Sequence, residues 1–228
     1  MATDPTNSTI EPSGLGILKG HALFIGLTGG IGSGKTAISD QLFQLGAGIV
    51  DTDLIAHEIT ASNGTAIPFI QKQFGAEFID SSGALDRARM RKLVFADPNA
   101  RKALEAITHP LIRQETILQA KQLIEQKVPY LVFVVPLLIE SGKWLSLLDY
   151  LVVVDCPEEV QIARVMHRSK LTQDDVKRIL EAQASRQERI AHADRVIENQ
   201  GSLISLQAEV LKLHQKILEI QKDRTSSS

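Results

Sequence analysis

Short runs of consecutive apolar residues alternate along this chain with segments whose apolar residues recur every three or four positions. Runs of the first kind are typical of strands buried on both faces; they lie at 22–27, 49–51, 130–135 and 151–154, and residues 195–198 (RVIE) are a candidate last strand. Segments of the second kind predict helices at 35–45, 87–96, 98–107, 110–126, 158–168, 173–183 and 203–220. The alternation predicts an α/β domain with a central parallel sheet flanked by helices.

The stretch between the second and third predicted strands differs from the rest, because it has helical patterns and little strand signal. We therefore expect a helical insertion over about 54–127, beside the sheet, where a second substrate can bind. The first 20 residues lack the basic start and the apolar core of a secretory signal. We expect a flexible leader over 1–20, one domain over 21–222 and a flexible tail over 223–228.

The composition is that of an ordinary globular protein and excludes several classes. Among the 228 residues, 43% are hydrophobic and 23% charged, which argues against disorder. The net charge of -2 provides no basic field for nucleic acid, and no apolar run approaches the length of a membrane span. The single cysteine, Cys156, excludes an internal disulfide and fits a reducing compartment. We expect a cytoplasmic protein that binds neither nucleic acid nor membrane and is a monomer, with weak self-association at most.

The strongest motif is at residues 29–36, where GGIGSGKT matches the phosphate-binding pattern G-x-x-x-x-G-K-[ST] between a strand and a helix. Its glycines allow backbone N–H groups to turn toward phosphate oxygens at a helix start, where an anion is favoured. Lys35 is expected to reach the β- and γ-phosphates of ATP, and the Thr36 hydroxyl to bind Mg²⁺. The expected nucleotide contacts are Gly29, Gly30, Ile31, Gly32, Ser33, Gly34, Lys35, Thr36 and Ala37.

Two other classes of nucleotide-binding protein are compatible with parts of this pattern. The loop also contains a G-x-G pattern, and Asp51 and Asp53 lie near the position of the acidic residue of dinucleotide-binding folds, although the Lys-Thr pair favours phosphate and magnesium chemistry. A GTP-dependent switch is disfavoured because no Asn is followed by Lys. The D-x-x-G match at residues 80–83 (DSSG) has the composition of a turn.

Asp51 and Asp53 end the second predicted strand, at the sheet edge where ligands bind in open α/β folds. A phosphoryl acceptor needs a carboxylate that orients its hydroxyl and accepts the proton. We favour Asp53 for this role and Asp51 as a further ligand of Mg²⁺; the alternative is that Asp53 caps the helix that follows. Asp155, after the strand at 151–154, either assists magnesium or begins a turn.

Arg164 and Arg168 are four residues apart on a predicted helix and so share one face. Paired guanidinium groups suit a triphosphate, and a solvated basic face is an equal alternative. Trp144, the only tryptophan, either stacks on adenine or packs in the core.

Taken together, these motifs resemble the dephospho-coenzyme A kinase family over about residues 23–201. The segments that carry the resemblance are 26–36, 50–53 (VDTD), 109–113 (HPLIR), 135–140 (VPLLIE), 161–168 and 193–199 (ADRVIEN). It implies a P-loop kinase with a central parallel sheet, a helical coenzyme-binding region and a mobile lid over about 164–192. The implied reaction is the magnesium-dependent transfer of phosphate from ATP to the ribose 3′-hydroxyl of dephospho-CoA, the last step of coenzyme A biosynthesis.

The resemblance also implies roles for single residues. Asp53 corresponds to the base, Lys35 and Arg164 act with it in catalysis, and Arg168 and Asn199 contact the nucleotide. The residues implied on the acceptor side are His109, Arg113, Pro136, Leu137 and Glu140. The alternatives are purely structural roles: His109–Pro110 separates two helices, and residues 136–140 belong to the core.

The sequence departs from the family pattern at three positions: Thr36 replaces the usual Ser, Thr52 the usual Ala, and Ser169 an acidic residue. Other functions compatible with the motifs are a kinase of another small metabolite or nucleotide, and a nucleotide-gated switch.

Overall fold

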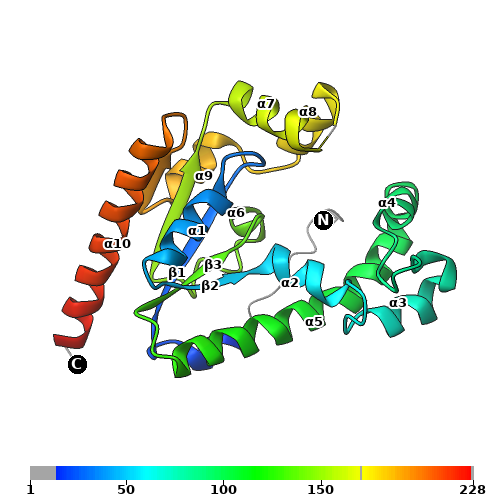
Figure 1. Cartoon of the computed structure of the whole chain (residues 1–228), viewed down its shortest axis with the longest axis horizontal. Coiled ribbons are helices and arrows are strands. Elements are labelled where there is room, and N and C mark those ends of the chain that lie inside the picture. Colours follow the sequence, from blue (N-terminus) through cyan, green and yellow to red (C-terminus); the bar gives the residue numbers. More distant parts are fainter. Residues whose placement is uncertain (1–13, 170, 227–228) are drawn as a thin grey trace, which may run out of the picture.

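The computed structural model describes residues 14–169 and 171–226 and has a five-stranded sheet at its centre (Figure 1). The order of the strands is β2-β3-β1-β4-β5, and every neighbouring pair is parallel. The strands are β1 (Leu23–Gly29), β2 (Gly48–Asp51), β3 (Tyr130–Val134), β4 (Tyr150–Asp155) and β5 (Arg195–Glu198). The predicted parallel α/β sheet is confirmed.

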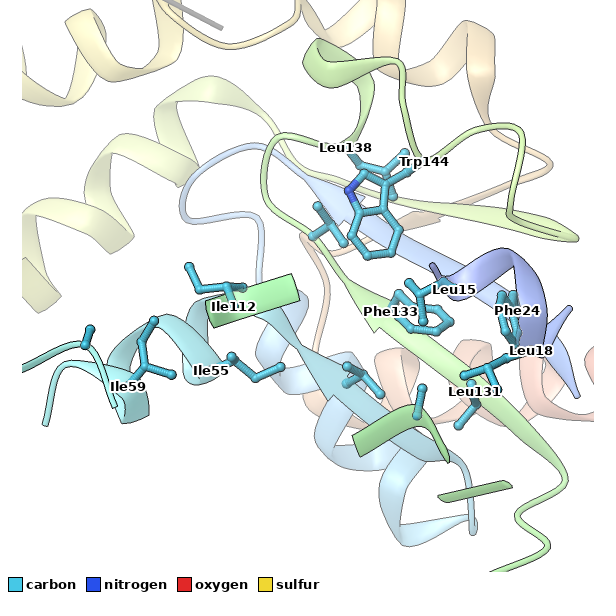
Figure 2. Close-up of a cluster of buried hydrophobic side chains, with 14 of the residues drawn as sticks. Leu15, Leu18, Phe24, Ile55, Ile59, Ile112, Leu131, Phe133, Leu138 and Trp144 are labelled. Atoms are coloured by element: carbon cyan, nitrogen blue, oxygen red, sulfur yellow. The ribbon is translucent and has the colours of Figure 1, made fainter. Parts of the chain in front are cut away.

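The central strands are buried because they carry apolar residues on both faces of the sheet. On one face, Phe24 and Phe133 lie in a cluster with Leu131 (Figure 2). The two aromatic rings pack edge to face, with a distance of 5.0 Å between their centroids. On the other face, Ile25 and Val132 belong to a second cluster. Successive residues of one strand thus point to opposite layers.

Helices cover both faces of the sheet, because both faces carry apolar side chains. Helices α1 (Lys35–Gln44) and α10 (Leu203–Ser226) pack on one face, and α2 (Thr52–Ile59) and α5 (Pro98–Glu125) on the other. The remaining helices are α3 (Ile67–Phe74), α4 (Arg87–Ala96), α6 (Leu138–Ser141), α7 (Glu158–Ser169), α8 (Gln173–Glu181) and α9 (Arg186–His192), with 3-10 turns η1 (Leu15–Leu18) and η2 (Ala76–Phe78). Helices α3 and α4 lie at the end of α5 that is farther from the sheet (Figure 1).

The segment between β2 and β3 is helical as predicted, but its longest helix was wrongly divided. Residues 98–107 and 110–126 were expected to form two helices, whereas α5 is continuous and has Pro110 in its interior. Proline removes one backbone hydrogen bond of a helix. The packing of α5 against α2, α4 and β2 holds the two halves together in spite of that loss.

Three further expectations differ from the structure. Residues 1–13 of the expected leader lie outside the described residues, whereas Leu15 and Leu18, within its second part, are buried in the core. Helix α10 continues to Ser226, past the expected start of the tail. Helix α9 was not predicted; it is only seven residues long, too short for a clear apolar period.

Candidate active site

The phosphate-binding pattern forms the loop between β1 and α1. Gly32 and Gly34 have left-handed backbone angles, with φ of 73° and 96°. A methyl group on Gly34 would clash with the side chain of Asn199, and one on Gly32 would lie 2.7 Å from the carbonyl oxygen of Gln161. Glycine is therefore required here both for its backbone angles and because other parts of the chain pack closely behind the loop.

Lys35 begins α1, and its side chain folds back over this loop. Its Nζ donates to the carbonyl oxygen of Gly29 at 2.7 Å. Burial lowers the pKa of the Lys35 ammonium, and the charge of Asp53 is the main influence that opposes this. The lysine thus lies within electrostatic reach of the candidate base, with part of its hydration removed.

The two aspartates after β2 have different structural roles. Asp51 caps α2, because its Oδ1 accepts from the N–H groups of Asp53 and Leu54 at 2.9 and 3.1 Å. Asp53 lies in the first turn of α2 with an exposed side chain. Its pKa is raised, first by desolvation from the surrounding protein atoms and then by Asp51, while Lys35 acts in the opposite direction. The capping role considered for Asp53 is thus filled by Asp51.

Helix α7 presents arginines to the same loop. Arg164 donates from Nη1 to the carbonyl oxygen of Ser33 at 3.4 Å, and the same nitrogen lies 3.6 Å from the Sγ of Cys156. Arg168 is exposed one turn later, and its charge contributes to the lowered pKa of Lys35. Both guanidinium groups therefore act on the region of the phosphate loop.

Asn199 follows β5, and its side chain supports the phosphate loop by a hydrogen bond to the loop's backbone. Its Nδ2 donates to the carbonyl oxygen of Ser33 at 2.7 Å, and the side chain is buried. Two buried side-chain atoms beside it, Ser33 Oγ and Gln161 Oε1, have no hydrogen-bond partner among the described residues. The loop is thus held from behind by Asn199, and two buried polar atoms near the loop keep unused hydrogen-bonding capacity.

Sequence reasoning missed two arginines of α9. Arg186 forms a two-pronged ion pair with Asp155, with contacts of 2.9 and 2.6 Å, and Asp155 is only 5% exposed. The carboxylate that was an alternative magnesium ligand is therefore occupied by a guanidinium. Arg189 is buried beside the phosphate loop. The capping box of Ser185 and Glu188, which begins α9, is the signal that could have located this helix.

The expected acceptor-side residues come from two elements. His109 and Arg113 lie on α5, which packs against α2, the helix of Asp53. His109 is half-buried; burial lowers its pKa, and the charges of Glu105 and Lys143 act on it in opposite directions.

The other expected acceptor-side residues lie just after β3. The carbonyl oxygen of Pro136 accepts from the Thr28 hydroxyl at 3.3 Å, and Leu137 is exposed. Glu140 accepts from the N–H of Ala184 at 2.7 Å and so connects this region to the segment before α9. Trp144 is 1% exposed and packs against Phe133, so core packing holds for it.

These residues fit a nucleotide and its magnesium ion. The glycine loop, Lys35 and the arginines form a concentrated positive region, and Thr36 is exposed in the first turn of α1. The described residues contain no group of three or more His, Cys, Asp or Glu side chains that could hold a metal by themselves. Such a site suits Mg²⁺, which commonly binds one or two protein ligands together with substrate phosphates and water.

A parallel sheet with a phosphate loop after its first strand, faced by a lysine, a carboxylate and arginines, defines a P-loop kinase. The sequence model of one such family, dephospho-CoA kinase, matches residues 23–205. The chain belongs to the dephospho-CoA kinase family.

Its relatives support this assignment over most of the chain. It is 57% identical to a dephospho-CoA kinase of Burkholderia pseudomallei over 86% of this chain and 95% of the relative. It is 53% identical to that of Aromatoleum aromaticum, over 88% and 97%. The solved dephospho-CoA kinase of Campylobacter jejuni superposes with a TM-score of 0.64 at 29% identity, over 86% of this chain and 97% of that one. Among the described helices, none has the length and apolar character to cross a bilayer.

Proposed function

We propose that this enzyme transfers the γ-phosphoryl group of ATP to the ribose 3′-hydroxyl of dephospho-CoA, giving coenzyme A and ADP in the last step of coenzyme A biosynthesis. The observation that carries the proposal is the electrostatic coupling of Lys35 with Asp53 beside the phosphate loop, in a chain that matches the family over residues 23–205. A phosphate-binding cation and a carboxylate within reach of each other are what transfer to an alcohol needs.

The nucleotide end of the site is assigned to the loop and to α7. The loop amides and Lys35 hold the β- and γ-phosphates, with Arg164 and Arg168 covering them. Thr36 and Asp51 are the residues proposed to hold Mg²⁺, which when bound neutralises charge on the phosphates. Asn199 acts on the nucleotide through Ser33, whose carbonyl oxygen accepts from it.

The chemical step needs a base, and Asp53 is assigned to it. The 3′-oxygen forms a bond to the γ-phosphorus while the bond from that phosphorus to the β–γ bridging oxygen breaks. The electron pair leaves with ADP, and the hydroxyl proton passes to Asp53. Desolvation raises the pKa of this carboxyl, which makes its carboxylate a better proton acceptor.

The acceptor end is assigned to the helical segment over about 54–127 and to the end of β3. His109 and Arg113 contribute from α5, and Pro136, Leu137 and Glu140 from the other side. The segment over about 164–192 is proposed to close as a lid that excludes water and so limits hydrolysis of ATP. We place the reaction in the cytoplasm and expect the enzyme to act as a monomer.

A coupled assay of ADP release tests this function. The enzyme with Mg²⁺ and ATP is given dephospho-CoA, a series of nucleoside monophosphates, or no acceptor. We expect dephospho-CoA to be the only one of these acceptors that causes ADP release, and coenzyme A to form with it. Equal rates with and without acceptor would overturn the proposal, and turnover with a nucleoside monophosphate would favour a kinase of another metabolite. Tight nucleotide binding without any ADP would indicate a switch.

A further inference from the structure

Arg189 of α9 lies next to the phosphate loop at Gly30. The residue is 7% exposed. Its Nη2 lies 3.1 Å from the position that a methyl group on Gly30 would occupy, so the guanidinium lies close beside the loop. Its Nη1 donates to the carbonyl oxygen of Ala184, which fixes the side chain from the α9 side. The charged end of Arg189 is therefore held at the loop.

Three carboxylates act on the positive charge of Arg189, and each of them also has another partner. Glu140, which acts most strongly, accepts from the N–H of Ala184. Asp155 is bound by Arg186, and Glu188 accepts from the N–H of Ser185. Over residues 14–169 and 171–226, Arg189 enters no ion pair. A buried guanidinium has five N–H donors and is costly to desolvate without an anion.

The electrostatic influences on Arg189 and Lys35 also favour a bound anion at the loop. Burial lowers the pKa of Arg189, and the charge of Arg189 contributes to the lowered pKa of Lys35. Two desolvated cations that repel each other meet at one loop. An anion bound between them, such as a polyphosphate, would relieve both the desolvation and the repulsion.

We propose that Arg189 is a catalytic residue, whose guanidinium contacts the phosphoryl group during its transfer from ATP. This inference rests on the proposed kinase function. As the bond from the γ-phosphorus to the β–γ oxygen breaks, negative charge grows on the bridging and phosphoryl oxygens, and a fixed guanidinium stabilises it more than it stabilises bound ATP. Arg186 has a different task, because its guanidinium is used by Asp155.

The test compares R189Q and R189K with R195Q as the matched control. Arg195 begins β5, outside the segment proposed as the lid, and its side chain is 44% exposed and pairs with Glu209 of α10. For each variant we measure kcat with dephospho-CoA, the affinity for ATP, and the affinity for ADP with aluminium fluoride, which imitates the transferring phosphoryl group. All variants are first compared in melting temperature.

For R189Q we expect kcat to fall by about 10²–10³-fold, with a similar loss of affinity for the fluoride complex. ATP affinity should fall by less than about tenfold, because the contact forms mainly in the transition state. R189K keeps the charge without the planar fork and should recover part of the loss. R195Q should match the wild type.

A kcat of R189Q within about threefold of the wild type overturns the inference, as does an equal loss of affinity for ATP and for the fluoride complex. If R189Q does not fold, R189K decides by the same two readouts. A wild-type enzyme that shows no dephospho-CoA-dependent ADP release overturns the proposed function instead, and the affinities for the fluoride complex then still decide the role of Arg189.

Discussion

Ile31 of the phosphate loop donates its amide hydrogen to the Oε1 of Gln183 at an N–O distance of 3.0 Å, although the two residues are 152 positions apart. Gln183 lies between α8 and α9, in the segment proposed as the lid. One backbone donor of the loop is thus taken by a side chain. We infer that nucleotide binding releases this contact.

Replacing Gln183 with Leu tests that competition. The substitution frees the Ile31 amide, and since one hydrogen bond contributes about 0.5–1.5 kcal/mol net, ATP affinity should rise roughly two- to tenfold. Calorimetry with a non-hydrolysable ATP analogue measures the change. Gln187→Leu, at an exposed position of α9, is the control. Unchanged or weaker binding by the Gln183 variant would mean that this contact persists with nucleotide bound.

Replacing Asp53 with Asn tests the assignment of the base. We expect kcat to fall by about 10²–10⁴-fold, the scale of general base catalysis, while ATP affinity is retained. Asp40→Asn, at an exposed position of α1, should leave kcat unchanged. A variant with near-normal turnover would remove Asp53 from the mechanism.

The raised pKa of Asp53 predicts two effects of pH. The wild-type rate should fall as pH falls through this raised pKa, because the protonated carboxyl cannot accept a proton. A folded-state pKa above the unfolded value also means that ionised Asp53 destabilises the fold at neutral pH, and that this penalty disappears as pH falls through the folded pKa. Asp53→Asn should therefore not lower the melting temperature at pH 7; a clear drop would show that the carboxylate stabilises the fold.

Local patterns were sufficient to predict the five strands and the phosphate loop, because each is encoded within a few consecutive residues. They failed where distant residues decide the structure. Tertiary packing carries α5 through Pro110, which sequence rules treat as a boundary. The pairing of Asp155 with Arg186 spans 31 positions. The contact of Asn199 with Ser33 spans 166, so the residue predicted at the nucleotide was found to hold the loop's backbone.

That contact predicts a structural cost for Asn199→Ala. The substitution removes the Nδ2 donor from the Ser33 carbonyl, which keeps its contact with Arg164, so the loss should cost about 0.5–1.5 kcal/mol of folding free energy. For a chain of this size each kcal/mol corresponds to roughly 2–4 °C in melting temperature. ATP affinity should fall as well, because the loop loses its support. Gln200→Ala changes an exposed amide next to it and should alter neither quantity; a stable Asn199 variant would show that the loop holds its shape unaided.

On the face of the sheet covered by α1 and α10, the hydroxyl of buried Tyr130 lies 2.7 Å from His214 Nδ1 of α10. Burial lowers the pKa of His214, so the folded protein binds this proton less tightly than the unfolded chain. The stability that depends on neutral His214 is complete above the unfolded pKa of about 6.5 and is lost as pH falls through the folded value.

Urea unfolding at pH 7.5 and 5.5 measures this dependence. His214→Leu should cost about 1–3 kcal/mol at the higher pH, since the Tyr130 hydroxyl loses its partner. The variant should also lose less stability than the wild type on acidification. Replacing Tyr130 with Phe as well should restore part of the cost at pH 7.5, because no buried hydroxyl remains. His109 has a lowered pKa too, so an equal pH dependence in wild type and His214 variant would assign the acid sensitivity to the helix that carries His109.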